Sequence, residues 1–344
     1  MLIKNTILEY PVLKLMSIGK GSFEAMGKII NRSGDTIRRM LMPISDSYTV
    51  MQNIAHDLFA HKQKLLLIFD DTLIKKVFSR KMVGAGYFFD TKIGRRVMAY
   101  KLLIAAISDG KYVIPLRCTL LFAKELLEIP MESKDAMVIG MVQIIFKLFP
   151  NKRFIIVADG AFATKNFLRW CVTNKVACEV RMHSNRKVEY KEKSVAIRNI
   201  TELRPKGKQT ARTIQVTWHS IPLEITAHRR IDKHGIESVV FQAATYSVKP
   251  ATHVRNYTYR WGVEKMIRTS KQTLSLQNCF STNMDTQLNH FGAALLAFAL
   301  AQTEMWRRHL KTPEAAIRAL DRKKFNFLKQ HFGRYLALNP HVHA

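Results

Sequence analysis

Two short apolar runs, each followed at once by aspartate, place the strongest constraint on how this chain can fold. Residues 65–69 precede Asp70 and Asp71, and residues 154–158 precede Asp159. Apolar runs of this length, rich in branched and aromatic residues, predict fully buried strands. An aspartate that ends such a strand lies on a rigid element at the edge of a sheet, where α/β folds usually bind ligands. Each aspartate taken alone is also compatible with a turn or a helix cap.

A third carboxylate belongs to a group of four residues whose spacing places them on one narrow stripe of a predicted helix. At about 100° per residue this stripe contains Tyr257, Arg260, Glu264 and Lys271. A carboxylate flanked by arginine, lysine and a phenol suits metal binding combined with phosphate contact. A solvated, salt-bridged face is the alternative for any one of them. Together with the two strand-ending aspartates, the glutamate is suited to hold a pair of Mg²⁺ ions, which prefer carboxylate oxygens.

The charge of the chain indicates a polyanionic partner. The 344 residues include 55 Lys and Arg against 26 Asp and Glu, a formal net charge of +29. Hydrophobic residues make up 47%, which favours a globular fold over a disordered basic tail. Nucleic acid is the expected partner. A peripheral membrane protein is the competing class, but no basic amphipathic helix stands out.

The cysteines and the apolar segments indicate in which cellular compartment the protein is expected. Cys118, Cys171, Cys178 and Cys279 form no Cys-x2-Cys pair, which is typical of free, buried thiols in a reducing compartment. The first residues lack the pattern of a signal peptide, and the longest apolar stretch, residues 291–301, is too short to span a bilayer. We therefore expect a soluble intracellular protein without a membrane partner.

Residues 1–60 predict a small helical DNA-binding domain. Residues 23–30 and 36–41 are expected to be helices, separated by a turn at residues 31–34 and with Asp35 as the cap of the second helix. This is a helix-turn-helix pattern in which Arg38 and Arg39 are available to a DNA groove or to phosphates. An ordinary helical hairpin explains the pattern about as well.

Residues 61–310 predict an α/β domain with a mixed sheet flanked by helices. The segments 97–107 and 112–122 read as a hairpin that joins the strand at 65–69 in three antiparallel strands. A helix over 132–148 then crosses to the strand at 154–158, and a helix over 165–174 with a strand over 176–182 completes a βαβ unit. This is the element order of an RNase H-like sheet.

An all-β insertion is expected at residues 186–249, with strands over 212–220, 223–230 and 238–246 and a turn at 232–235. The helix of the third carboxylate is expected to begin at Pro250, and another helix to cover 285–309. Residues 311–344 predict a basic C-terminal helical segment that leaves Arg322, Lys323 and Lys324 exposed.

The chain resembles the DDE transposases of bacterial insertion sequences, in the group with a Tyr-Arg-Glu-Lys signature. The resemblance covers roughly residues 60–300 and rests on three features: the intact spacing of the helical quartet, the β-rich insertion, and the two aspartate motifs. These motifs are Asp70-Asp71-Thr72, similar to the family's Asp-x-Thr, and Asp159-Gly160-Ala161-Phe162. The doubled aspartate leaves the first ligand ambiguous, and Asp70 is favoured because Thr72 then follows two residues later.

The resemblance implies an RNase H-like core that cleaves DNA at the ends of a mobile element and joins the 3′-OH ends to target DNA. The implied ligands of Mg²⁺, for which Mn²⁺ would substitute, are Asp70, Asp159 and Glu264. Arg260 and Lys271 would contact phosphates and Tyr257 would pack against the DNA. Trp218 in the insertion would stack on a base, although a place in the insertion's own core is the stronger interpretation.

The resemblance also implies a homodimer acting on paired ends of double-stranded DNA, in the bacterial cytoplasm and associated with the nucleoid. Three alternatives remain open at this point: an RNase H-like nuclease without strand transfer, a domesticated DNA-binding copy, and a repressor that uses only the N-terminal helices.

Overall fold

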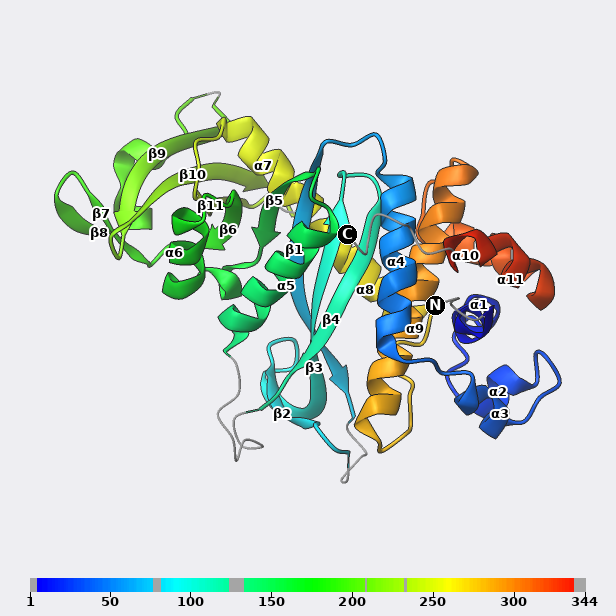
Figure 1. The fold of residues 1–344 in the computed structure, drawn as a ribbon. Helices are drawn as coiled ribbons and strands as arrows, with labels where there is room; N and C mark the ends of the chain where they lie inside the picture. Colours follow the sequence, from blue (N-terminus) through cyan, green and yellow to red (C-terminus); the bar gives the residue numbers. More distant parts are fainter. Residues whose placement is uncertain (1–4, 77–81, 124–132, 208, 232–233, 337–344) are drawn as a thin grey trace.

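The computed structural model describes residues 5–76, 82–123, 133–207, 209–231 and 234–336. It has an α/β fold with a large mixed sheet flanked by helices, as predicted (Figure 1). The strands of the sheet are β1 (Lys64–Lys75), β2 (Gly86–Asp90), β3 (Arg95–Ser108), β4 (Val113–Leu121), β5 (Arg153–Ala158), β6 (Cys178–Met182), β7 (Lys187–Tyr190), β8 (Lys193–Ala196), β9 (Ala211–Trp218), β10 (Ile221–Ile231) and β11 (Glu237–Ala244).

The helices are α1 (Glu9–Met16), α2 (Phe23–Gly27), α3 (Gly34–Arg39), α4 (Ile44–Leu58), α5 (Lys134–Leu148), α6 (Lys165–Thr173), α7 (Pro250–Tyr259), α8 (Trp261–Gln272), α9 (Met284–Arg307), α10 (Pro313–Asp321) and α11 (Phe325–Gly333). Short 3-10 turns cover Asn5–Leu8, Gly160–Phe162, Ile197–Asn199, Thr201–Leu203 and Arg334–Leu336. None of the helices in the described ranges has the length and apolar character needed to cross a membrane.

The predicted strand order is confirmed around β1. This strand is antiparallel to β3, which is antiparallel to β4, and β1 is parallel to β5, which is parallel to β6. One expectation is wrong: β1 does not end at Asp70 but continues to Lys75. The parallel pairing with β5 ends at Phe69 and Ala158, whereas the antiparallel pairing with β3 continues, which keeps the backbone of β1 extended.

The β-rich insertion extends the sheet of the α/β domain. Its strands β9, β10 and β11 begin and end within two residues of the predicted segments, and β11 pairs antiparallel with β6. The sequence did not predict β2 or the β7–β8 hairpin. The first two residues of the turn expected at 232–235, and the first residue of the helix expected at 132–148, lie outside the described residues.

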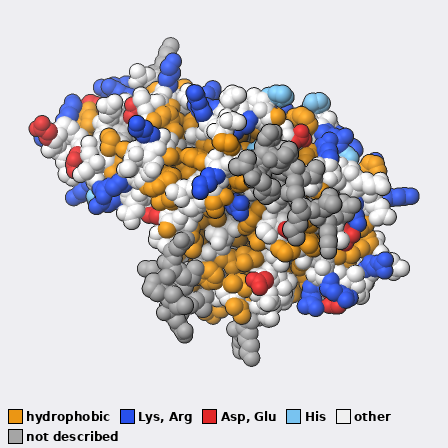
Figure 2. All heavy atoms as spheres, in the orientation of Figure 1, with side chains coloured by type: hydrophobic (Ala, Val, Ile, Leu, Met, Phe, Trp, Pro, Cys, Tyr) orange, Lys and Arg blue, Asp and Glu red, His pale blue; other side chains and the backbone are white. Residues whose placement is uncertain are grey.

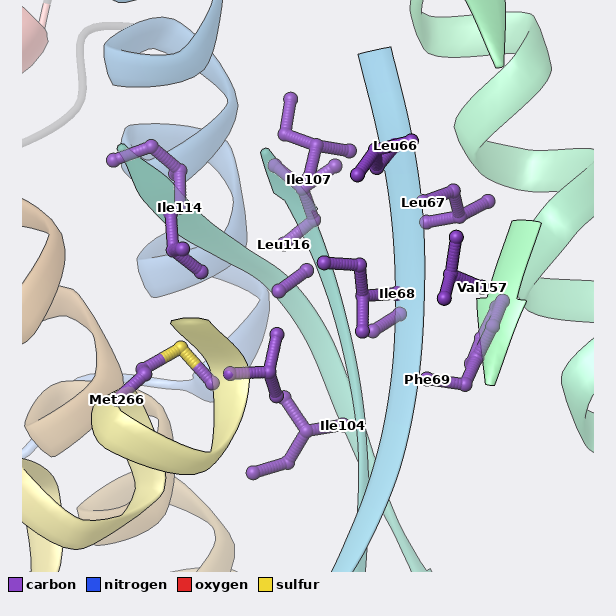
Figure 3. Packing of buried hydrophobic residues seen from close by; sticks show 14 of the residues in the cluster. Leu66, Leu67, Ile68, Phe69, Ile104, Ile107, Ile114, Leu116, Val157 and Met266 are labelled. Carbon is purple, nitrogen blue, oxygen red and sulfur yellow. The ribbon is translucent and has the colours of Figure 1, made fainter. Parts of the chain in front are cut away.

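The main core is formed by the sheet together with α4, α8 and α9 and with α5 and α6. Helix α9 contacts α1, α4, α8, α10 and β4, which explains why its apolar stretch is buried. Helix α8 packs against β1 and β4, and Figure 3 shows Met266 of α8 and Ile104 of β3 pointing toward each other. A Cβ at Gly262 would lie 2.7 Å from Cγ2 of Val113 in β4, so glycine permits this close approach.

The N-terminal helices differ from the prediction in their ends. Helix α2 stops at Gly27 rather than at residue 30, and α3 is capped by Ser33, whose side chain accepts from the backbone N–H of Thr36. Asp35 is therefore not the cap; its carboxylate pairs with Arg38 and Arg39 instead.

At the other end of the chain, the single basic helix expected after residue 311 is two helices, α10 and α11. The exposed Arg322, Lys323 and Lys324 lie between them. The four cysteines are buried and free, as predicted.

Candidate active site

The pairing of β1 with β5 brings the two predicted aspartates to the same edge of the parallel strands. Phe69 pairs with Ala158, so Asp70 and Asp159 are the next residues of neighbouring strands. Asp159 follows the end of β5, and its Oδ1 accepts from the N–H of Gly160 at 2.6 Å. Asp70 accepts from the N–H of Asp71 at 2.9 Å. Backbone hydrogen bonds thus fix the direction of both carboxylates.

Arg260 joins Asp70 to the third predicted carboxylate. Its Nη1 lies 3.3 Å from Oδ2 of Asp70, and its Nη2 lies 2.5 Å from Oε1 of Glu264. The guanidinium carbon also lies 5.3 Å from the centre of the Tyr257 ring. The structure therefore brings together residues from the end of the parallel pairing and from the helical quartet, although they are far apart in sequence.

Burial and like charge both disfavour the ionised form of Asp70. Burial raises the pKa of Asp70 to about 6; Arg260 opposes this shift and Glu264 adds to it. Burial lowers the pKa of Arg260, but nearby Tyr257, Glu264, Asp70 and Asp159 outweigh it, so the net shift of this pKa is upward. Arg260 therefore stays charged and compensates a partly desolvated carboxylate cluster.

Asp71 belongs to the opposite face of β1. Its Oδ2 lies 2.7 Å from Nζ of Lys134 in α5, and its Oδ1 lies 3.4 Å from Nζ of Lys101 in β3. Successive side chains of a strand point to opposite faces, so only one of the two adjacent aspartates can face α8. That one is Asp70.

Lys271 reaches the same strand beyond the carboxylates. Its Nζ donates to the carbonyl oxygen of Leu73 at 2.7 Å. Burial, together with the charges of Lys92 and Lys75, lowers the pKa of Lys271 to about 8, while Asp90 opposes the shift. A second cation thus lies along β1, on the side where β2 and β3 extend beyond the carboxylates.

The quartet lies on two helices rather than on the one continuous helix expected. Arg260 separates α7 from α8 and keeps helical dihedral angles (φ −55°, ψ −30°). Its N–H donates to Tyr257 and its carbonyl accepts from Val263, both bonds of the tighter i to i+3 type. Tyr257 and Arg260 are only 9% and 7% exposed, so the alternative of a solvated face is wrong for these two residues.

The other predicted DNA contacts lie outside this cluster. Trp218 is 8% exposed, and the guanidinium of Arg186 lies 4.8 Å from the centre of its ring. Arg186 also donates to the carbonyl of Ala163, just after the turn that follows Asp159. The low exposure of Trp218 favours the interpretation that it belongs to the insertion's own core. Arg38 and Arg39 are exposed on α3.

One buried polar group beneath the quartet was missed from the sequence. Glu179 of β6 is fully buried, and its Oε1 accepts from Tyr246 Oη at 2.5 Å and from Asn256 Nδ2 at 2.8 Å. Asn256 directly precedes Tyr257, so this carboxyl group anchors α7 to the sheet. The available signal was a single acidic residue in the otherwise apolar start of a predicted buried strand.

The donor chemistry of the cluster fits a divalent metal ion. In the described ranges, no group of three His, Cys, Asp or Glu side chains is already arranged around a common centre. The guanidinium of Arg260 pairs with both Asp70 and Glu264. The side chains that surround this positive charge supply the carboxylate oxygens that hard cations such as Mg²⁺ prefer.

A mixed sheet with aspartates at the adjoining ends of parallel strands, crossed by a helix that carries a glutamate, is the arrangement of an RNase H-like catalytic core. A family model described as the transposase DDE domain matches residues 61–300. The chain therefore belongs to the DDE transposase family, and the resemblance seen in the sequence is confirmed. The search of curated proteins gave no match.

Proposed function

We propose that this transposase binds the ends of an insertion sequence, cleaves the DNA strands at the site of Asp70, Asp159 and Glu264, and joins the 3′-OH ends to target DNA. The observation that carries the proposal is the meeting of Asp70 and Glu264 on Arg260, beside Asp159. Family membership supports the reaction class. An RNase H-like nuclease would cut at the same site without joining strands, so the joining assay decides between the two.

The three carboxylates are proposed to hold Mg²⁺, with Mn²⁺ as a substitute. Bound divalent cations activate a water or a 3′-hydroxyl and stabilise the leaving oxygen in phosphodiester chemistry. The backbone of the protein positions the carboxylates that would hold the ions. Asp159 is held by the N–H of Gly160 and Asp70 by the N–H of Asp71, so both acids are fixed before DNA arrives.

The cations of the helical quartet are proposed to bind DNA phosphates near the cut. Arg260 offers a planar pair of donors that suits a phosphate as well as a carboxylate. Lys271 is held against β1 by its bond to Leu73 and presents a second charge on the same side. Tyr257 packs against Arg260 and is proposed to keep its guanidinium directed at the site.

Double-stranded DNA is the proposed partner, bound by a homodimer on paired ends. Lys and Arg side chains are spread over the β-rich insertion and the region of α2 and α3 on the face shown in Figure 2. The exposed Arg38 and Arg39 of α3 are proposed contacts to the element's end. With a formal charge of +29, contacts to phosphate should supply much of the affinity.

The test compares Asp70→Asn with Asp71→Asn on DNA that carries the element's end, in Mg²⁺. Asp70→Asn and Glu264→Gln should abolish both nicking and joining, since both steps use the same site. DNA binding should survive in these variants, because phosphate contacts come from Arg and Lys. Asp71→Asn is the matched control and should remain active. Activity that persists in Glu264→Gln would refute the three-carboxylate mechanism.

A further inference from the structure

The β2–β3 hairpin carries two large aromatic side chains that are more than half exposed. Tyr87 is 54% exposed and Phe89 is 60% exposed, and they alternate along β2 with less exposed residues. Two exposed aromatic rings on one face of a short strand are unusual for a surface without a partner. In Figure 1, β2 lies at the lower end of the sheet, on the side where α9 begins.

Strand register places these rings on the same face of the sheet as Asp70. Tyr87 pairs with Met98 and Phe89 with Arg96, so each pair shares a face. Along β3 this face continues through every second residue to Ile104, which pairs with Asp70 of β1. Both registers are regular over these residues. The exposed rings therefore continue the face of the sheet that carries Asp70.

Among the described residues, basic side chains lie beside the rings. Lys92 in the hairpin turn and Arg96 beside Phe89 are exposed. The acid of the hairpin, Asp90, is nearly buried, and its Oδ2 lies 2.5 Å from Nζ of Lys75. Lys92 is close enough to Lys271 to affect its ionisation. A basic surface thus runs from the active site to the hairpin.

The residue after β1, Lys76, connects β3 to the loop between α8 and α9. The N–H of Lys76 donates to the carbonyl of Met98, and its Nζ donates to the carbonyls of Gln277 and Cys279 at 3.0 and 2.6 Å. The next residue, Phe280, is 73% exposed and lines a pocket that also includes Arg38 of α3. The buried Lys76 therefore ties the end of β1 to the loop that carries the exposed Phe280, next to Arg38 of α3.

We propose that Tyr87, Phe89 and Arg96 form a DNA-contact surface beside the active site, in which the rings contact bases and the basic residues contact phosphates. The inference rests on the proposed function, because it assigns to that site a further stretch of its DNA. Aromatic rings interleaved with Lys and Arg suit DNA whose strands are locally separated, as at a cut end, since each unstacked base has a face on which a ring can stack. A second copy of a chain with a net charge of +29 would bring like charge to this surface.

The test measures DNA affinity and reaction steps in two hairpin variants, Tyr87→Ser with Phe89→Ser, and Arg96→Ala. The matched controls are Phe327→Ser, an aromatic that is 49% exposed on α11, and Arg95→Ala, which lies on the opposite face of the hairpin. Thermal unfolding of all four establishes that they fold. We expect the aromatic variant to bind about tenfold more weakly and the controls to stay within about twofold of the unchanged protein.

The outcomes separate the possible sources of DNA. If the hairpin variants bind end-bearing DNA more weakly, the hairpin contacts the element or its flank. If they cleave the ends normally but no longer join them, the hairpin contacts target DNA. Either result supports the proposal. Unchanged affinity, cleavage and joining in folded hairpin variants would overturn it. It would also be overturned if the hairpin variants only convert a DNA-free dimer into a monomer. If the unchanged protein binds DNA through the hairpin but never cleaves, the proposed function fails while the contact surface stands.

Discussion

Replacing Glu179 by glutamine should change how the stability of the protein depends on pH. Glu179 is fully buried under α7, where Tyr246 and Asn256 donate to its Oε1. Burial raises the pKa of this carboxyl to about 7, and the two hydrogen bonds oppose the shift without cancelling it. Its other oxygen, Oε2, is buried with no hydrogen-bond partner among the described residues, so it is the natural position for the proton.

The sign and size of this pH dependence follow from the linkage between protonation of Glu179 and folding. A carboxyl whose pKa is higher in the folded state than in the unfolded state stabilises the fold most at low pH, and this contribution is lost as pH rises through the folded-state value. The pKa changes from an ordinary value of 4.5 to about 7. At about 1.4 kcal/mol per pH unit, the wild-type protein should lose about 2 to 3 kcal/mol from this group between about pH 5 and about pH 8.

Glu179→Gln keeps an oxygen that can accept from Tyr246 and Asn256 but cannot ionise. Its free energy of unfolding, from urea titrations at several pH values, should therefore gain about 2 to 3 kcal/mol relative to wild type as pH rises from about 5 to about 8. In the difference between the two proteins, the contributions of the other titrating groups to stability cancel. Parallel stability curves for wild type and variant would refute the reasoning. Glu179→Ala, which removes the acceptor, should be destabilised at every pH and should lose nicking activity because α7 loses its anchor.

Three further predictions follow from charge and burial. Affinity for DNA should fall about 10³- to 10⁵-fold between 50 and 200 mM salt if roughly 6–10 phosphates are contacted, and a flat salt titration would contradict a nucleic-acid role. Arg38→Ala with Arg39→Ala should weaken binding equally on all DNA sequences if these residues contact phosphates, but reduce discrimination by about 1–3 kcal/mol per base contact if they read bases; gel-shift titrations on end and random DNA separate the two. Trp218→Ala should lower the melting temperature, at a cost of about 3–5 kcal/mol, because it empties a buried site. If that protein remains stable and only second-strand processing suffers, Trp218 stacks on DNA instead.

The strands and most helices were predictable because their signals are local. The apolar runs at residues 65–69 and 154–158 are buried strands, and their parallel pairing follows from the intervening helix. The extension of β1 to Lys75 was not predictable in the same way. Residues 71–75 are mixed in polarity, and they stay extended because β3 pairs with them. That pairing is a contact between distant segments, which no local pattern reveals.

The ambiguity between Asp70 and Asp71 has the same origin. From the sequence we can infer that two adjacent side chains of a strand point to opposite faces of the sheet. The sequence does not reveal which of these faces packs against the helix of the third carboxylate. The structure shows different partners for the two side chains: Asp71 pairs with Lys101 and Lys134, and Asp70 pairs with Arg260, which supports Asp70 as the proposed ligand. The role of Glu179 was not predicted either: a single acid in an apolar strand was visible in the sequence, but its partners Tyr246 and Asn256 were not.

Arg260 connects the sequence pattern to the chemistry of the site. Its spacing from Glu264 would suit an ordinary salt bridge on a solvated helix, which contributes little to stability. The structure shows a different situation, because Arg260 is 7% exposed and also reaches Asp70 of β1. A buried arginine shared by two carboxylates is costly to desolvate, and a hydrophobic pair would serve stability as well. The buried arginine is therefore better explained by the proposed function, in which Arg260 holds like charges together without DNA and offers a planar cation to a phosphate when DNA arrives.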